Sequence, residues 1–170
     1  MVVASQQKKL RIVNISSGVE EEGYQKKKNV HRNSLLFNVF YKQSKKNDRL
    51  DESNCLCSYL NLSSDERYLL VNTNISEIHL WDLQTKQKVQ KYTGHSQTVS
   101  FVGGCFGGIS QNFVVSGSED SQIYIWHRMT GSLLSTLSGH AGIVNMVAWS
   151  PKNSKLLVSC SDDHTIRFWS

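Results

Sequence analysis

The run GHSQTVSFVGGCFGGISQNFVVSGSEDSQIYIW occupies residues 94–126, and a related run, GHAGIVNMVAWSPKNSKLLVSCSDDHTIRFW, occupies residues 139–169. Each begins with Gly-His and ends with Trp after an alternating apolar stretch, and the two Gly-His pairs stand 45 residues apart. A Gly-His that recurs with this period and is closed by a tryptophan is typical of four-stranded β-propeller blades. The sequence therefore predicts an all-β fold made of such blades.

Three tryptophans set the length of the repeat. Trp81, Trp126 and Trp169 are separated by 45 and 43 residues, and each ends an alternating apolar run of the kind that forms a strand. Residues that fit a pleated surface indicate a strand before each of them, at residues 68–71, 113–117 and 156–159. By the same spacing we expect strands at residues 57–62, 87–92, 98–105, 132–137 and 143–149, with the glycine-rich run 103–108 as a loop after the strand at 98–105.

This spacing divides the chain into blades. We predict a degenerate blade at residues 55–95, a complete blade at residues 96–140 and a last blade without its outer strand at residues 141–170. Residues 1–17 resemble two strands of a further, degenerate blade, and residues 18–54 form a basic insertion in which residues 35–41 could add an outer strand. Propellers close with roughly 4 to 8 blades of about 40 to 45 residues. We therefore expect an open propeller of about three and a half blades.

Two sets of polar residues occupy the same places in consecutive repeats. In both sets a serine stands ten residues before the tryptophan and an aspartate six residues before it. We expect the aspartate to cap turn amides and accept from the histidine, the histidine to reach the serine, and the serine to meet the indole N–H. A buried polar group without a hydrogen-bond partner destabilises the fold by ~1 to 3 kcal/mol, and these partners avoid that cost. The candidate site residues are His95, Ser116, Asp120 and Trp126 in one blade and His140, Ser159, Asp163 and Trp169 in the next.

A serine, a histidine and an aspartate also suggest a hydrolase. A catalytic triad needs an exposed nucleophile, an oxyanion site and a single copy, whereas this set occurs twice and places each serine inside a strand. We therefore interpret both sets as structural and expect no enzyme activity. The repeat that ends at Trp81 and Asp82 differs from the other two. Because Val71 and Ile75 take the serine and aspartate places there, we expect apolar packing alone to hold it.

The formal net charge of +5 is concentrated in the first third of the chain. Residues 1–55 carry 11 Lys and Arg against 6 Asp and Glu, whereas residues 56–170 carry 8 of each. Mixed charge runs of this kind are usually solvated loops. RNA binding is an alternative reading of the basic insertion, although no aromatic ladder or recognition helix accompanies it.

Signals for ligands and for targeting are few. The cysteines at positions 55, 57, 105 and 160 lack the paired CxxC spacing of a zinc site, so we expect no metal and no cofactor. Residues 1–10 contain no signal-peptide core, and the chain contains no run of about 18 apolar residues. We therefore expect no contact with a membrane and a cytoplasmic or nuclear location.

The repeats as a whole resemble the WD-repeat (WD40) family. Within it, the runs 78–92 (IHLWDLQTKQKVQKY), 105–108 (CFGG), 117–120 (GSED) and 123–127 (IYIWH) are similar to the C-terminal blades of the WD-repeat subunit of the CTLH/GID ubiquitin ligase complex. The resemblance covers residues 57–170. It implies a β-propeller, CTLH/GID-type subunits and ubiquitination substrates as partners, and a role in ubiquitin-dependent protein degradation.

Three hypotheses of function follow from these observations. The leading one is a non-catalytic scaffold or adaptor that binds other proteins, because repeated blades without a unique reactive cluster favour binding over chemistry. The second is an RNA-associated protein that uses residues 18–54, and the third is a truncated product without an independent function. Under the leading hypothesis neither a nucleic acid nor a small molecule is the expected partner.

Overall fold

The chain divides into two compact units, Met1–Asp51 and Glu52–Ser170, and the computed structural model describes residues 2–4, 10–12 and 55–170. In the first unit, β1 (Val2–Ala4) and β2 (Leu10–Ile12) pair antiparallel, with Val2 opposite Ile12. Both strands fall within the segment 1–17 for which two strands were predicted. The insertion at residues 18–54, with its outer strand at 35–41, lies outside the described residues.

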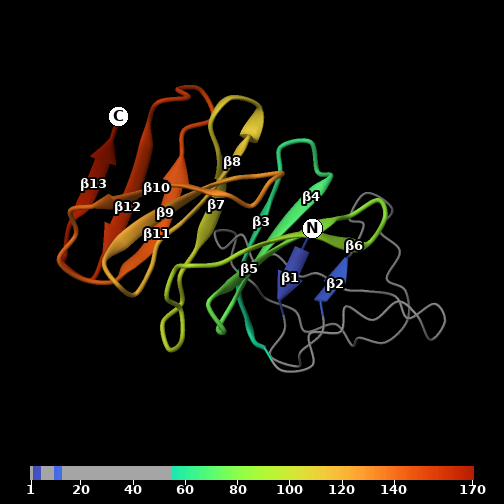
Figure 1. Cartoon of the computed structure of the whole chain (residues 1–170), viewed down its shortest axis with the longest axis horizontal. Coiled ribbons are helices and arrows are strands. Elements are labelled where there is room, and N and C mark those ends of the chain that lie inside the picture. The colour runs from blue at the N-terminus through green and yellow to red at the C-terminus, as the bar shows by residue number, and fades with distance from the viewer. Residues whose placement is uncertain (1, 5–9, 13–54) are drawn as a thin grey trace, which may run out of the picture. The chain divides into compact units, whose positions relative to one another are not determined.

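Residues 55–170 form three antiparallel sheets, two of four strands and one of three, in which the strands pair in chain order (Figure 1). The first blade contains β3 (Cys57–Leu62), β4 (Tyr68–Thr73), β5 (Glu77–Asp82) and β6 (Gln87–Tyr92). The middle blade contains β7 (Gly104–Gly107), β8 (Phe113–Ser116), β9 (Gln122–His127) and β10 (Leu133–Ser138). The last blade contains β11 (Val144–Trp149), β12 (Leu157–Ser161) and β13 (Ile166–Trp169). This succession of sheets confirms the predicted all-β blade architecture.

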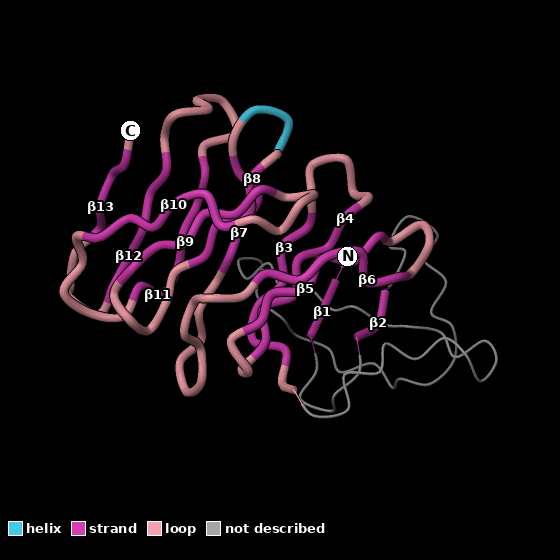
Figure 2. Tube along the Cα trace, viewed as in Figure 1, coloured by secondary structure: helices cyan, strands magenta, loops and turns pink. Residues whose placement is uncertain are grey.

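Helix is almost absent from the described residues. One short 3-10 turn, η1 (Ile109–Gln111), lies in the connection between β7 and β8 (Figure 2). Within the same described ranges, no helix has the length and apolar character needed to cross a membrane.

The middle blade buries apolar side chains on both of its faces. Successive side chains of a strand point to opposite faces, and along β9 Tyr124 and Trp126 join one core while Ile123 joins another. The core shared with the first blade contains Leu70, Ile78, Leu80, Tyr92, Phe106, Val114, Tyr124 and Trp126. The core shared with the last blade contains Cys105, Val115, Ile123, Val144, Val147 and Leu157. Burial of one large apolar side chain contributes about 1.5 to 3 kcal/mol to the stability of the fold. The packing of the blades against one another is therefore a major source of stability.

The turn between the second and third strands has the same backbone conformation in every blade. Ser76, Ser121 and His164 each stand five residues before the tryptophan of their blade, with φ of 58°, 68° and 66°. This left-handed conformation costs an ordinary residue free energy, so hydrogen bonds to the turn are needed to hold it. In the middle and last blades the residue just before it is the aspartate of the predicted line, which is therefore placed to cap the turn.

The inner strand of the middle blade differs from the prediction. Residues 98–102 form no strand, and β7 consists of the run predicted to be a loop, so the strand expected at 98–105 with a loop at 103–108 was wrong. β7 contacts both β3 and β11, the inner strands of its neighbours. A Cβ on Gly104 would lie 3.0 Å from the Val115 carbonyl oxygen, and one on Gly107 would lie 2.4 Å from the Trp149 ring. The glycines are therefore required by the close approach of neighbouring segments, which is why they occur inside a strand.

Candidate functional site

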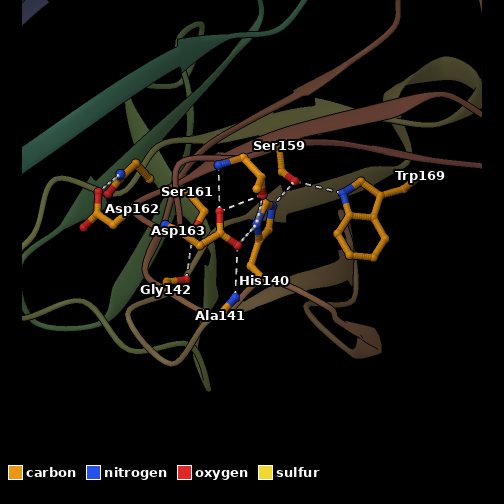
Figure 3. A network of polar contacts seen from close by, with 10 residues as sticks. His140, Ala141, Gly142, Ser159, Ser161, Asp162, Asp163 and Trp169 are labelled. Atoms are coloured by element: carbon orange, nitrogen blue, oxygen red, sulfur yellow. Dashed lines mark hydrogen bonds and ion pairs between the residues drawn. The ribbon is translucent and has the colours of Figure 1, made fainter.

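The last blade carries a continuous line of four hydrogen-bonded side chains (Figure 3). The indole N–H of Trp169 donates to Ser159 Oγ at 2.8 Å, and Ser159 Oγ lies 2.7 Å from His140 Nε2. His140 Nδ1 lies 2.7 Å from Asp163 Oδ2. Because a carboxylate only accepts, Nδ1–H donates to Asp163, and in the neutral imidazole the Ser159 hydroxyl donates to Nε2. The bonds follow the order predicted from the sequence and tie β12 and β13 to the two connections beside them.

Asp163 anchors this line at the turn between β12 and β13. Its carboxylate also accepts from the Ala141 N–H at 3.0 Å, from the Thr165 N–H at 2.9 Å and from the Thr165 hydroxyl at 2.7 Å. Burial by itself would raise the pKa of Asp163, but the hydrogen bonds from Thr165, Ala141 and His140 hold the pKa well below its usual value. The carboxylate is therefore charged at neutral pH, and its hydrogen bonds take the place of water.

The surroundings of Ser159 decide between a structural and a hydrolytic role. Its distances to His140 and onward to Asp163 are those of a catalytic triad, in which the serine must reach a substrate carbonyl carbon. Ser159 is only 2% exposed, however, and its Oγ already accepts the indole N–H of Trp169. A substrate has no path to this hydroxyl, so the line stabilises the blade.

The histidine of the middle blade packs as an aromatic ring. His95 is 3% exposed, and neither ring nitrogen has a hydrogen-bond partner among the described residues. The ring meets Trp126 edge-on with 5.6 Å between centroids, while the Trp126 indole donates to the Thr93 carbonyl oxygen at 3.0 Å. Burial lowers the pKa of His95 to about 4, and the charge of Asp120 offsets only part of this effect. His95 is therefore neutral at physiological pH.

The serine and the aspartate of the middle blade also bond elsewhere. Ser116 Oγ accepts from the Asn72 side chain of the first blade at 3.3 Å, and Asp120 accepts from the Tyr124 hydroxyl at 2.6 Å. Ser116 and Asp120 thus make these contacts and no hydrogen bond to His95. The prediction that is wrong here is the hydrogen-bonded line through His95, Ser116, Asp120 and Trp126.

The first blade is held by ion pairs as well as by apolar packing. Trp81 is 8% exposed and its indole nitrogen has no hydrogen-bond partner among the described residues. Asp82, by contrast, accepts from two turn amides at 2.8 and 3.1 Å and pairs with Arg67 at 3.1 Å. Glu77 pairs with Lys91 of the neighbouring strand at 2.8 Å. The expectation that apolar packing alone holds this blade was therefore wrong, because polar pairs across strands replace the missing line.

One candidate site was missed by the sequence analysis, namely the loop 98–101 between β6 and β7. Glu119 Oε1 accepts from the amides of Thr98, Val99 and Ser100 at 3.0, 2.9 and 2.7 Å, and Oε2 accepts from the Thr98 hydroxyl at 2.9 Å. Burial would raise the pKa of Glu119, but these bonds lower it to about 2. The loop held in this way leaves Val99 and Phe101 89% and 79% exposed. Their alternation favours a strand, and no local signal marks them as exposed.

The described residues show no sign of a metal site. No group of three or more His, Cys, Asp or Glu side chains in residues 2–4, 10–12 and 55–170 is arranged to hold an ion. Burial raises the pKa of the Cys105 thiol to about 12, so this cysteine is a thiol at neutral pH and not a reactive thiolate.

A family model agrees with the blade architecture. The model for the WD domain, G-beta repeat, matches residues 86–127 and 131–170. These two segments begin in the turn before the outer strand of one blade and end at or just after the third strand of the next, so they contain the residues of both predicted hydrogen-bonded lines.

Individual proteins are similar to this chain as well. The WD repeat-containing protein 26 homolog of Arabidopsis thaliana is 50% identical over 123 residues, which are 72% of this chain and 21% of that protein. The GID complex subunit 7 of Schizosaccharomyces pombe is 47% identical over 109 residues, 64% of this chain and 22% of that protein. The WD repeat-containing protein 26 homolog of Drosophila melanogaster is 42% identical over 108 residues, 64% of this chain and 17% of that protein. The chain thus spans about a fifth of the length of the curated relatives it matches.

Proposed function

Because this chain belongs to the WD-repeat family, we propose that it is a non-catalytic adaptor that binds other proteins through the connections at the ends of its blades. One contrast carries the proposal. The serine, histidine and aspartate side chains of the last blade form hydrogen bonds with one another inside the blade, whereas the loop 98–101 exposes apolar side chains to solvent. Ordered blades with exposed connections are suited to recognition and not to covalent chemistry.

We further propose that its partners are the subunits and substrates of a CTLH/GID-type ubiquitin ligase. The 47% identity to GID complex subunit 7 of Schizosaccharomyces pombe supports this assignment, together with the resemblance of residues 78–127 to the WD-repeat subunit of such a complex. In this role the chain helps to bring proteins to ubiquitination and degradation, in the cytoplasm or the nucleus.

Affinity purification tests the proposal. The tagged full chain is expressed in cells of its own source and the recovered proteins are quantified by mass spectrometry, with and without RNase. We expect enrichment of CTLH/GID-type subunits that survives RNase and is lost in His140→Phe, which removes two hydrogen bonds from the last blade. Recovery of none of these subunits would overturn the ligase assignment. Recovery that RNase abolishes would favour the RNA-associated alternative, whose residues 18–54 lie outside the described residues.

A further inference from the structure

The two ends of the blades in residues 55–170 differ in charge. Because the strands are antiparallel and in chain order, alternate connections lie at the same end. The end formed by residues 74–76, 93–103, 117–121, 139–143 and 162–165, which we call the acidic end, has no Lys or Arg in these connections and four carboxylates, those of Glu119, Asp120, Asp162 and Asp163. The guanidinium of Arg167, which belongs to β13, lies beside Gly139 at the last-blade side of this end. The opposite end, formed by residues 63–67, 83–86, 108–112, 128–132 and 150–156, holds two carboxylates and the cations Arg67, Lys86, Arg128, Lys152 and Lys155. In Figure 1 the β6–β7 connection hangs below the sheets and the β7–β8 connection lies above them.

Backbone hydrogen bonds join the connections of the acidic end into one surface. The bonds run from Glu119 N–H to the Ser96 oxygen at 2.9 Å, from Val144 N–H to the Ser118 oxygen at 3.1 Å and from Asp162 N–H to the Ile143 oxygen at 2.9 Å. The first and third bonds join two connections, and the second joins the first residue of β11 to the β8–β9 connection. The carboxylates of two blades and the loop between β6 and β7 are therefore held in a fixed arrangement.

The loop 98–101, which we call the apolar loop, is the most exposed apolar feature of this surface. Val99 and Phe101 are 89% and 79% exposed although Glu119 orders the backbone between them. An apolar side chain on an ordered loop loses little entropy when it is buried in a partner, and aromatic residues are frequent binding hot spots. The backbone of the apolar loop is thus already ordered in the free chain, which favours binding of a partner.

We propose that the apolar loop, together with the exposed carboxylates of Asp120 and Asp162 at the same end, docks a basic segment of another protein, whose apolar side chain covers Phe101. This inference rests on the proposed adaptor function and names the partner chemistry for it. Complementary charge at the rim of an interface selects the partner, while the buried centre supplies affinity. The same carboxylates repel phosphates, so a nucleic acid is disfavoured at this end of the blades.

Binding of designed peptides to the full chain tests the proposal. Three short fluorescent peptides have the same length and the same pattern of charged and apolar positions. The first has Lys and Arg at the charged positions and Leu and Phe at the apolar ones. The second has Ser in place of Leu and Phe, and the third has Glu in place of Lys and Arg. Fluorescence anisotropy is expected to give a dissociation constant about tenfold lower, or better, for the first peptide than for the other two. Its affinity is expected to fall as salt is raised.

Matched variants locate the binding site. The double variant Val99→Ser with Phe101→Ser is expected to weaken the basic apolar peptide by about tenfold or more. Ile109→Ser is the control, because Ile109 is 73% exposed on η1 at the opposite end of the blades. Asp162→Asn, which removes one charge from an exposed side chain, is expected to weaken binding by about two- to threefold and to reduce its salt dependence. Circular dichroism checks that every variant is folded.

Several results would overturn the proposal. These are equal binding of the acidic peptide or of a single-stranded RNA, equal weakening by Ile109→Ser, and an effect of the double variant on self-association with none on peptide binding. The double variant also separates this inference from the adaptor role. If it loses the peptide but still recovers the ligase subunits, another surface holds the assembly together and the apolar loop receives the substrate. If it binds the peptide as the unaltered chain does, the docking site is wrong while the adaptor role stands.

Discussion

The middle and last blades place the same four residue types at the same distances from their tryptophans, yet only the last blade joins them by hydrogen bonds. In the middle blade, Asn72 of the preceding blade donates to Ser116 Oγ. The place of Asn72 is taken in the next repeat by Gly117, which has no side chain that could reach Ser159 and whose Cβ would lie 2.1 Å from the Val144 carbonyl oxygen. Whether a blade forms its line is therefore decided in part by the blade before it.

A second difference lies inside each blade. Tyr124, two residues before Trp126, donates its hydroxyl to Asp120 at 2.6 Å, and its ring meets that of His95 edge-on with 6.4 Å between centroids. The corresponding residue of the last blade is Arg167, whose guanidinium lies beside Gly139. The surroundings of the two blades thus differ at two residues outside the four-residue motif, Asn72 and Tyr124. The last blade forms a hydrogen-bonded line, and the middle blade forms an aromatic cluster.

The largest expected effect follows from exchanging each histidine for a ring that cannot form hydrogen bonds. His140→Phe removes the bonds to Ser159 and Asp163 and is expected to lower the free energy of unfolding by about 3 kcal/mol. His95→Phe is the matched control and is expected to change it by less than about 1 kcal/mol, because the His95 nitrogens have no partner to lose. Urea unfolding followed by tryptophan fluorescence measures both variants. Equal losses would contradict the difference between the blades.

Acidification is expected to give the next largest effect, and it acts through His95. The pKa of His95 is lowered from 6.5 to about 4 in the folded chain, so between these values the unfolded chain binds a proton that the folded chain does not. The His95 contribution to stability therefore rises with pH across this window and falls by about 2.5 kcal/mol as the pH drops from 6.5 to 4. Urea midpoints at several pH values measure the slope.

The same experiment on His95→Phe is the control for this slope. The variant has no group at position 95 that titrates in the window, so its slope is expected to be smaller by that amount. Asp163 does not interfere, because its lowered pKa contributes stability that is lost only as the pH falls below the ordinary value of 3.8. An unchanged slope in the variant would show that other groups cause it.

The sequence could predict the strands but not all of the contacts between them. Alternation and turn residues are local signals, and they located β3 and β6 at the observed residues. The glycines of β7 could not be assigned in this way, because the contacts that require them come from β8 and from neighbouring blades. The same holds for Ser116, whose partner Asn72 lies 44 residues earlier. The sequence analysis missed the apolar loop because apolar and polar residues alternate in it, as they do in a half-buried strand.

Removing both competitors of the middle blade is expected to have a smaller effect and to rebuild its line. Asn72→Ala frees Ser116 and Tyr124→Phe frees Asp120, and each loses one hydrogen bond worth about 1 kcal/mol. In the double variant His95 can turn to the freed groups, so the combined loss is expected to be smaller than the sum of the single losses. A double-mutant cycle measures this coupling. NMR titration of His95 measures the same change independently, since its pKa is expected to rise above about 4 as the ring gains an acceptor. Strict additivity with an unchanged pKa would mean that other contacts fix the ring.

The smallest expected effect concerns the first blade, which has neither the histidine nor the serine of the four-residue motif and uses ion pairs instead. Lys91→Ala breaks the ion pair with Glu77, but the lysine side chain is 50% exposed, so water and salt screen most of the attraction. We expect the free energy of unfolding to fall by less than about 0.5 kcal/mol, and by less still at high salt. Lys88→Ala, three residues earlier in β6 and opposite Trp81, is the control for loss of a lysine from the same exposed strand. A loss of stability in Lys91→Ala as large as that in His140→Phe would contradict this expectation. It would mean that an exposed ion pair stabilises the first blade as strongly as the buried hydrogen bonds stabilise the last one.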